Sequence, residues 1–439
     1  MARTVNSNNG WFLACPAPKA GKIEEGFYNC GSGLTDDTVT ETDEFSIMQI
    51  ISGVCEDDFK NYSELLKNAG YSCILENSIG NNLYCQYTDN QKVWHVSYLP
   101  AKSQMRVTED ICGVPMSRFA YNAGADCNTQ SAIYQYGLYY DPNNDVTDRT
   151  VNCGMFYVIR LRDNSLVLMD AGHIFQASDK TVENMLAFLH KITGTKDGET
   201  ITVAAWYITH AHGDHVSSTA KLFNRFKDQI DLKRVMYNFP SYQVRSRGYD
   251  PLTTTAKEIV RKLYPDVDFL KLHSGMKFDL GGVEFEIIYT HEDAVDVDTG
   301  MTYNLRDYNC TSTVMRIRFD QKSVMLLGDI SQAAEQIIVK SFDSKVLASD
   351  VVQVAHHCFN LLEDIYSRVN APIAFMPNSY YGSHRPENLP KLAKVLEHVE
   401  NDQIYYESGN TVGLAVVDGK MSVIFDESAF AEEYDFSGF

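Results

Sequence analysis

Four potential metal ligands lie within six consecutive positions, in the segment Thr209-His210-Ala211-His212-Gly213-Asp214-His215. An apolar run over 201–208 leads directly into this segment, so His210 and His212 can turn from a strand end toward one metal ion. Gly213 permits a sharp turn, after which Asp214 and His215 can face a second ion a few ångströms away. Imidazole and carboxylate are ligands that zinc, manganese and iron accept. The spacing therefore predicts a site for two divalent metal ions, of which zinc is the most expected.

Two later apolar runs also end in residues that can bind metal. The run 323–327 precedes Gly328-Asp329, and the run 351–355 precedes His356-His357. Each run is typical of a buried strand that delivers its last residues to one edge of a sheet. Taken alone, Asp329 fits an ordinary strand end equally well, and the two histidines could merely line a pocket.

The pattern His-x-His-x-Asp-His after a buried strand resembles the signature of the metallo-β-lactamase fold superfamily, over about residues 150–425. The resemblance implies that Asp170, in Asp170-Ala171-Gly172, supports the ligand histidines without binding metal itself. It also implies that Asp329 bridges the two metals and that one of the pair His356 and His357 binds the second.

Two ligand assignments stay open at this point. The strand end favours His356, whereas alignment with relatives that read His-Gly-Ser favours His357, although Cys358 and Phe359 replace the Gly-Ser here. A further ligand is expected between positions 215 and 329, where His291 follows an apolar run over 283–289. We favour His291 over His273, which precedes a turn, although one branch of the superfamily lacks this ligand.

The C-terminal half is similar to that branch, the hydrolase domain of bacterial competence DNA-uptake proteins. Two elements carry the resemblance, Asn309-Cys310-Thr311-Ser312 and Asn378-Ser379-Tyr380-Tyr381-Gly382-Ser383-His384-Arg385-Pro386. It implies that His384 lies in the pocket and binds or protonates an anionic leaving group. The alternative is a solvent-exposed loop histidine.

The resemblance implies an α/β fold, a four-layer αββα sandwich over 151–425. Upstream, the sequence predicts an irregular arm over 1–43, a small α+β module over 44–110 and a tyrosine-rich connector over 111–150, and downstream an acidic tail over 426–439. The module is expected to act as a lid, a dimerisation surface or a stabilising cap. We favour a cap that lines one wall of the cleft, with Tyr134, Tyr136, Tyr139 and Tyr140 nearby.

Composition narrows the classes of partner. The 439 residues contain 58 acidic and 38 basic side chains, a net charge of −20, which disfavours non-specific binding to nucleic acid. The ten cysteines include no Cys-x-x-Cys pair, and we find neither a signal peptide nor a membrane-spanning run. We therefore expect a cytoplasmic protein that acts on a small-molecule substrate and does not bind a membrane. The sequence is compatible with a homo-oligomer.

Together these features predict a metallo-hydrolase. Two metal ions lower the pKa of a bridging water from about 16 to about 7, and the resulting hydroxide attacks a phosphorus or carbonyl centre. Asp214 and Asp329 would orient this hydroxide. A phosphodiester or phosphoester substrate follows from the competence-protein resemblance, whereas the acidic surface favours a carboxylic ester, lactone or thioester. A non-hydrolytic iron-binding oxidoreductase of the same fold is a further alternative.

Overall fold

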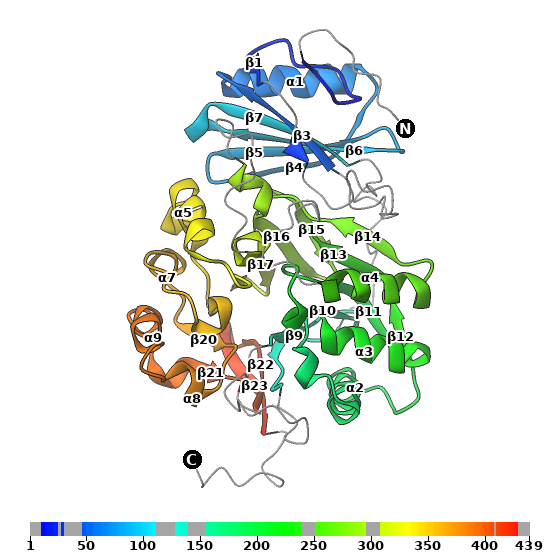
Figure 1. Ribbon diagram of the computed structural model, residues 1–439, viewed down its shortest axis with the longest axis vertical. Helices are drawn as coiled ribbons and strands as arrows, with labels where there is room; N and C mark the ends of the chain where they lie inside the picture. Colours follow the sequence, from blue (N-terminus) through cyan, green and yellow to red (C-terminus); the bar gives the residue numbers. More distant parts are fainter. Residues whose placement is uncertain are drawn as a thin grey trace.

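The structure is a computed structural model that describes residues 10–24, 28–29, 46–110, 128–138, 154–238, 251–295, 308–407 and 410–428. Its strands form three sheets, one in an N-terminal module and two that face each other in a larger sandwich domain (Figure 1). Within these ranges, no helix has the length and apolar character needed to cross a membrane.

The N-terminal module is an antiparallel sheet of order β1-β3-β7-β6-β5-β4, with β2 paired to β3. Helix α1 covers one face of the sheet, where it buries Phe59, Tyr62 and Leu66 (Figure 1). Trp11 and Leu13 join the same core, so the segment predicted to be an irregular arm contributes to the module. The elements are β1 Lys22–Ile23, β2 Tyr28–Asn29, β3 Ser46–Ser52, α1 Glu56–Asn68, β4 Ser72–Ile79, β5 Asn82–Thr88, β6 Val93–Leu99, the 3-10 turn η1 Pro100–Lys102 and β7 Gln104–Asp110.

The first sheet of the sandwich has the order β14-β13-β11-β10-β9-β8-β22-β23, with β12 paired to β11. Three helices pack on its outer face through an apolar cluster that includes Val182, Phe223 and Val260. The elements are β8 Ala132–Gln135, β9 Phe156–Arg160, β10 Leu166–Asp170, α2 Asp179–Thr193, β11 Ile201–Tyr207, α3 Ser217–Arg225, β12 Ile230–Leu232, β13 Arg234–Tyr237, α4 Pro251–Leu263, β14 Asp268–Lys271, β22 Asn410–Val417 and β23 Lys420–Ser428.

The second sheet runs β15-β16-β17-β18-β19-β20-β21, and helices that include α5, α7 and α9 cover its outer face. Its elements are β15 Lys277–Leu280, β16 Val283–Tyr289, β17 Val314–Phe319, β18 Lys322–Leu326, α5 Gln332–Ser341, α6 Ser344–Leu347, β19 Val351–Gln353, α7 Ile365–Val369, β20 Ile373–Met376, α8 Tyr380–Ser383, α9 Leu389–Leu396 and β21 Ile404–Tyr406.

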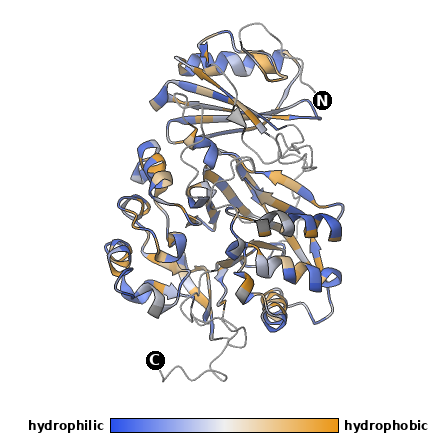
Figure 2. Cartoon of the chain, viewed as in Figure 1, coloured by the Kyte–Doolittle hydropathy of each residue, from blue (hydrophilic) through white to orange (hydrophobic). Residues whose placement is uncertain are grey.

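An apolar core fills the space between the two sheets. It takes side chains such as Val167 and Tyr207 from the first sheet and Phe285, Ile317 and Phe375 from the second. Apolar and polar residues alternate along the outer helices, as expected for helices that cover a sheet with one face (Figure 2). The predicted four-layer αββα sandwich is therefore confirmed.

Two domain boundaries differ from the prediction. Strand β8, which falls in the predicted connector, pairs with both β9 and β22 and so belongs to the sandwich. Its Tyr134 and the following Tyr136 are buried against Phe188, while Tyr139 and Tyr140 fall outside the described residues. At the other end, β23 continues to Ser428, so the first residues of the predicted acidic tail are part of a strand.

The module packs on the sandwich through buried ionic groups. His273, which follows β14, lies 2.8 Å from Asp110 of the module through Nε2 and 2.8 Å from Glu292 through Nδ1. Lys271 donates to Ser46 across the same boundary, and Arg106 donates to the Glu292 carbonyl. Because β14 runs parallel to β13 and β11, this contact lies at the edge of the sheet where His210 follows β11.

Burial alone would lower the pKa of His273, but the flanking Asp110 and Glu292 carboxylates outweigh it and raise this pKa to about 10. Lys271 of β14 and the stacked ring of His95 of β6 also face this cluster of His273, Asp110 and Glu292. The pKa of His273 in the folded protein lies above the ordinary value of about 6.5. The charged imidazole therefore stabilises the folded state fully below pH 6.5, and this stabilisation is lost as pH rises toward 10.

We therefore expect the free energy of unfolding to fall between about pH 7 and 10, with a contribution from His273 that approaches about 1.4 kcal/mol per pH unit. Urea unfolding across this range measures the slope, and His273→Gln should reduce it. An identical slope in the two proteins would contradict the assignment of a charged imidazole at this boundary.

Candidate metal centre

The candidate site lies where strands of both sheets end at one edge of the sandwich. In the first sheet, β10 and β11 are parallel and end at Asp170 and shortly before His210. In the second sheet, β18 and β19 are parallel and end shortly before Asp329 and His356. The loops that follow these four strands bring most of the predicted ligands together.

Asp170 organises the first half of the site. It is fully buried in a left-handed backbone conformation with φ of +58°. Its Oδ1 accepts a hydrogen bond from the Thr209 amide at 2.8 Å, and its Oδ2 accepts from the Thr209 hydroxyl at 2.9 Å. Oδ2 also lies 2.8 Å from His215 Nδ1, which leaves the opposite ring nitrogen, Nε2, to face the site. These contacts fit the supporting role that the resemblance implies for Asp170.

Asp214, His215, Asp329 and His357 form the centre of the site. One ligand atom from each of the four lies within 4.8 Å of the others. His215 Nε2 is 3.1 Å from Asp329 Oδ2 and 3.7 Å from Asp214 Oδ2. His357 Nε2 is 3.3 Å from the same Asp329 oxygen and 3.7 Å from Asp214 Oδ2. Two carboxylates and two imidazoles thus converge on one small volume.

The backbone at Asp329 is held by Ser312 and by the preceding glycine. The Asp329 amide donates to Ser312 Oγ at 3.0 Å. Gly328 has φ of +59°, and a Cβ there would meet Ser312 at 3.0 Å and Thr209 at 3.2 Å. A side chain at Gly328 would be strained by the positive φ and crowded by Ser312 and Thr209, because the two halves of the site approach each other closely here.

His356 and His357 are turned into the site by an unusual stretch of backbone. His356, His357 and Cys358 have φ values of +47°, +50° and +63°, so three consecutive residues other than glycine are left-handed. Such strain persists only where the surroundings fix it, and it is common at functional sites.

Neighbouring residues hold the two rings in different ways. Nδ1 of His357 lies 2.8 Å from the Pro377 carbonyl, and Asn378 Nδ2 donates to the His357 carbonyl at 2.8 Å. His357 is therefore the fixed member of the pair and belongs to the central cluster. His356 is also close, with Nε2 4.0 Å from Asp329 Oδ2 and 3.2 Å from Asn309 Nδ2.

His210 and His212 lie beside the central cluster. Nε2 of His210 is 2.9 Å from Nδ1 of His212 and 3.9 Å from Asp329 Oδ2. His210 is completely buried, and its burial together with the neighbouring His215 and His212 lowers its pKa well below the ordinary range. Its imidazole is therefore neutral, which is the form that binds metal. Asp329 Oδ2 is thus shared by histidines from both halves of the site.

Electrostatic coupling dominates the central cluster. Burial raises the pKa of Asp329, but His357 and His215 more than offset this and hold that pKa well below the ordinary value. Burial would lower the pKa of His215, yet the carboxylates of Asp329 and Asp170 raise it. The cluster therefore favours ionised carboxylates, which are the form that a divalent cation requires.

The donor set fits a divalent metal. Asp329 Oδ1 is buried and makes no hydrogen bond within the described part of the chain. His357 Nε2 is likewise buried without a partner in hydrogen-bond geometry. Buried polar atoms of this kind require an explanation, and a bound ion is one of the few available. Nitrogen and carboxylate oxygen donors suit zinc, manganese and iron.

Two residues that were predicted to belong to the site, His291 and His384, lie outside the central cluster. The structure directs His291 Nε2 to Asn238 Oδ1 at 3.0 Å, and Asn238 Nδ2 in turn donates to the Leu272 carbonyl. His384 stacks on the Tyr380 ring with centroids 3.9 Å apart, and its Nδ1 lies 2.8 Å from the Tyr380 carbonyl. Neither belongs to the group of four, so their roles as ligand and as leaving-group residue stay predictions.

Glu407 is a residue near the site that the sequence did not single out. It follows β21, is 1% exposed, and has both carboxylate oxygens buried without a hydrogen bond in the described structure. Burial raises its pKa well above the ordinary value, although His357 and His215 oppose the shift. A single glutamate after a short apolar strand gave no signal, because only the folded chain places it near these histidines.

The supporting role of Asp170 yields a prediction. Replacement of Asp170 by asparagine keeps the shape of the side chain but removes its charge and one acceptor. We expect the affinity for zinc to fall by about 10- to 100-fold. Titration against a chelator of known affinity measures the change. An affinity within about twofold of the wild type would show that Asp170 does not orient His215 for metal binding.

The two facing sheets between helical layers, with histidines and aspartates at one edge, are the arrangement that the resemblance to the metallo-β-lactamase fold superfamily implies. No protein-family model and no curated protein matches the sequence. Among solved structures, the chain is similar to the metallo-β-lactamase fold protein YhfI from Bacillus subtilis, with 12% identity, a TM-score of 0.38, and coverage of 65% of this chain and all of YhfI.

Two further solved structures share this likeness. Zn²⁺-bound PqqB from Methylobacterium extorquens is 10% identical with a TM-score of 0.31, and 51% of this chain covers 71% of PqqB. A diphosphatase of the PhnP family is 14% identical with a TM-score of 0.30, and 56% of this chain covers 85% of it.

Proposed function

We propose that this chain is a metal-dependent hydrolase that acts on a phosphodiester or phosphoester. The observation that carries the proposal is the cluster of Asp214, His215, Asp329 and His357, which converges on one small volume and leaves Asp329 Oδ1 without a hydrogen bond in the described chain. In this proposal the attacking group is a water, because the four side chains are metal ligands and not nucleophiles.

Divalent metal bound here would lower the pKa of that water and stabilise negative charge on the reacting phosphate. The side chains have separable tasks. Asp329 shares one oxygen between His210 on one side and His215 and His357 on the other, so it would hold metal together with the histidines of both halves of the site. Asp214 faces both His215 and His357 and would accept a hydrogen bond from the attacking water.

Two asparagines support the choice of a phosphorus ester. Asn309 lies against His356 and Asn378 against His357, so both elements that resemble the competence-protein hydrolases contact the histidines of this edge. The net charge of −20 favours the second candidate, a carboxylic ester, lactone or thioester, because a strongly acidic surface repels polyanions.

A substrate panel separates these candidates. The full chain is loaded in turn with Zn²⁺, Mn²⁺ or Fe²⁺ and assayed with bis-p-nitrophenyl phosphate, p-nitrophenyl phosphate, p-nitrophenyl acetate and a chromogenic lactone. We expect the phosphorus esters to be hydrolysed faster than the acyl substrates. Faster acyl hydrolysis would support the second candidate. Bound iron with no hydrolysis of any substrate would contradict the hydrolase proposal and favour the oxidoreductase.

A further inference from the structure

An aromatic ring lies beside the two histidines that the second sheet brings to the candidate metal centre. Phe359 comes two residues after His357, and its side chain is half-buried. Its ring centroid is 5.7 Å from that of His356, with the rings at 83°, and 5.8 Å from that of His357, with the rings at 51°. The ring therefore contacts both imidazoles and keeps part of its surface exposed.

Hydrogen bonds hold this segment close to the central carboxylate. The Phe359 amide donates to the His356 carbonyl at 2.7 Å. Asn360 Nδ2 donates to the Ile330 carbonyl at 3.3 Å, and Ile330 directly follows Asp329 in the chain. The segment that carries the aromatic ring is thus tied to the loop that carries Asp329.

Exposed hydrocarbon adjoins the same edge of the sandwich. Leu361, two residues after Phe359, is 40% exposed. On the first sheet, Ile174 is 49% exposed and lies four residues after Asp170, in the 3-10 turn η3 Ile174–Gln176. Both segments follow strands whose carboxyl ends lie at the edge where the candidate ligands gather. Large apolar side chains that are exposed beside a site are typical of a surface that binds a ligand.

An aromatic group is the ligand chemistry that fits this surface. Aromatic rings attract one another edge to face or offset, with centroids about 4.5–7 Å apart, as Phe359 and His356 already do. A second ring on the exposed part of Phe359 gains the same kind of contact, and the hydrocarbon of Leu361 follows in the chain. A short alkyl group covers less of this surface and gains no contact between rings.

We propose that the substrate of the metal centre is a phosphoester whose ester group is aromatic, and that Phe359 binds this ring with Leu361 beside it. The inference rests on the proposed phosphoesterase function and adds the chemical class of the group next to phosphorus. In this arrangement Phe359 and Leu361 determine specificity, whereas the carboxylates and imidazoles of the centre hold the metal.

Three phosphonates test the proposal by calorimetry on the zinc-loaded full chain. Benzylphosphonate carries an aromatic ring, cyclohexylmethylphosphonate carries a saturated ring of the same size, and ethylphosphonate carries no ring. In all three a methylene group separates the variable part from phosphorus, which keeps the acidity of the phosphonates similar. We expect benzylphosphonate to bind at least about tenfold more tightly than ethylphosphonate and about threefold more tightly than the cyclohexyl compound.

Equal affinity for benzylphosphonate and ethylphosphonate, or tighter binding of the cyclohexyl compound, would overturn the inference and leave the phosphoesterase proposal standing. No binding of benzylphosphonate up to about 10 mM would overturn it as well. The substrate panel described above would then show whether the phosphoesterase proposal falls with it.

Variants locate the bound ring. Phe359→Ser should bring the affinity for benzylphosphonate to within about twofold of that for ethylphosphonate, with ethylphosphonate binding unchanged. Metal content measured by mass spectrometry establishes that the variant keeps its zinc, and Leu361→Ser should weaken benzylphosphonate by about threefold. Val417→Ala is the matched control with wild-type binding, because Val417 is also 40% exposed but ends β22, which runs antiparallel to β10 and so ends at the opposite edge.

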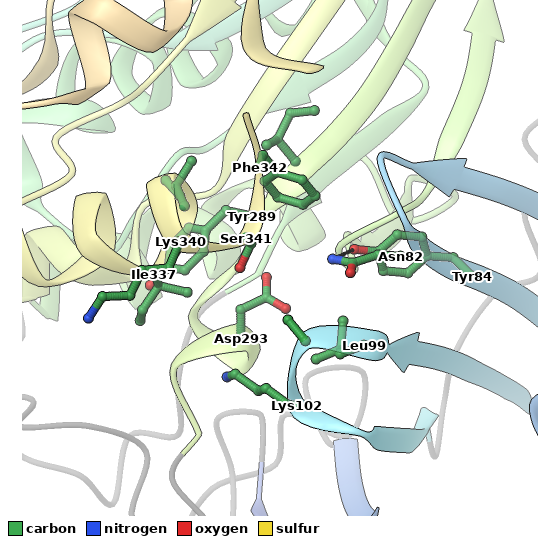
Figure 3. Close-up of a pocket in the computed structure, with 13 residues that line it drawn as sticks. Asn82, Tyr84, Leu99, Lys102, Tyr289, Asp293, Ile337, Lys340, Ser341 and Phe342 are labelled. Carbon is green, nitrogen blue, oxygen red and sulfur yellow. Dashed lines mark hydrogen bonds between the residues drawn. The ribbon is translucent and has the colours of Figure 1, made fainter. Parts of the chain in front are cut away.

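A second place for an aromatic ring is a separate cavity of about 200 Å³ between the module and the sandwich, lined in part by Tyr84, Leu99 and Phe342 (Figure 3). Leu99→Trp fills this cavity and should leave the affinity for benzylphosphonate unchanged. Binding weakened by at least about tenfold in Leu99→Trp, together with wild-type binding in zinc-loaded Phe359→Ser, would place the ring in this cavity and overturn the inference.

Discussion

Replacement of Asp329 by alanine should lower turnover on the best substrate by at least about a thousandfold. The change removes the carboxylate whose Oδ2 lies within 4.0 Å of imidazole nitrogens of His210, His215, His356 and His357. Without it, the two halves of the site lose the carboxylate that histidines from both halves contact. The measurement is kcat with saturating metal, compared with the metal content of the purified protein.

The fold should survive this change, because the apolar core between the sheets does not include Asp329. Asp266→Ala, on an exposed turn before β14, is the matched control and should retain wild-type turnover. An Asp329→Ala protein that keeps both full metal content and wild-type turnover would show that this carboxylate is not part of the reacting centre.

Replacement of Asp110 by alanine should destabilise the protein by about 3–5 kcal/mol, the usual cost of removing one partner of a buried ion pair. Asp110 lies at the boundary between module and sandwich, where its Oδ2 contacts His273 and its Oδ1 accepts from Ser46 Oγ. The variant leaves a buried cation with Glu292 as its carboxylate partner. Urea unfolding at pH 7 measures the loss.

Glu64→Ala, an exposed position on α1 of the same module, is the control and should change stability by less than about 0.5 kcal/mol. If Asp110→Ala cost less than about 1 kcal/mol, the buried ionic network would not hold the module in place. A mobile lid would then fit the module better than the fixed cap that these contacts support.

Much of the candidate metal centre was predictable because its candidate ligands follow strands. An apolar run that ends in a histidine or aspartate places that side chain at a sheet edge, and parallel strands end at the same edge. This reasoning found the regions of His210, Asp329 and His357 before their contacts were known. The αββα layers followed from the same alternation of strands and helices together with the family resemblance.

Other features could not be predicted, because they depend on contacts between residues that are far apart in the sequence. His291 follows its strand as the prediction requires, but Asn238, which follows β13 of the other sheet, lies 3.0 Å from its Nε2. No local pattern announces such a partner. Strand β8 is four residues long and lies in a tyrosine-rich stretch, so its pairing with β22, far along the chain, left no periodic signal. The choice between His356 and His357 likewise depended on Pro377 and Asn378, about twenty residues later.

The central claim, that His210, His215, Asp329 and their neighbours hold metal, is tested most directly by the metal content of the full chain. Protein stripped with a chelator, loaded with Zn²⁺ and freed of excess metal should retain about two zinc ions per chain by mass spectrometry. Asp329→Ala prepared in parallel should retain fewer, while Asp266→Ala should match the wild type. A wild-type protein that retains less than about 0.1 equivalents of metal when loaded in the same way with zinc, manganese or iron would contradict the claim.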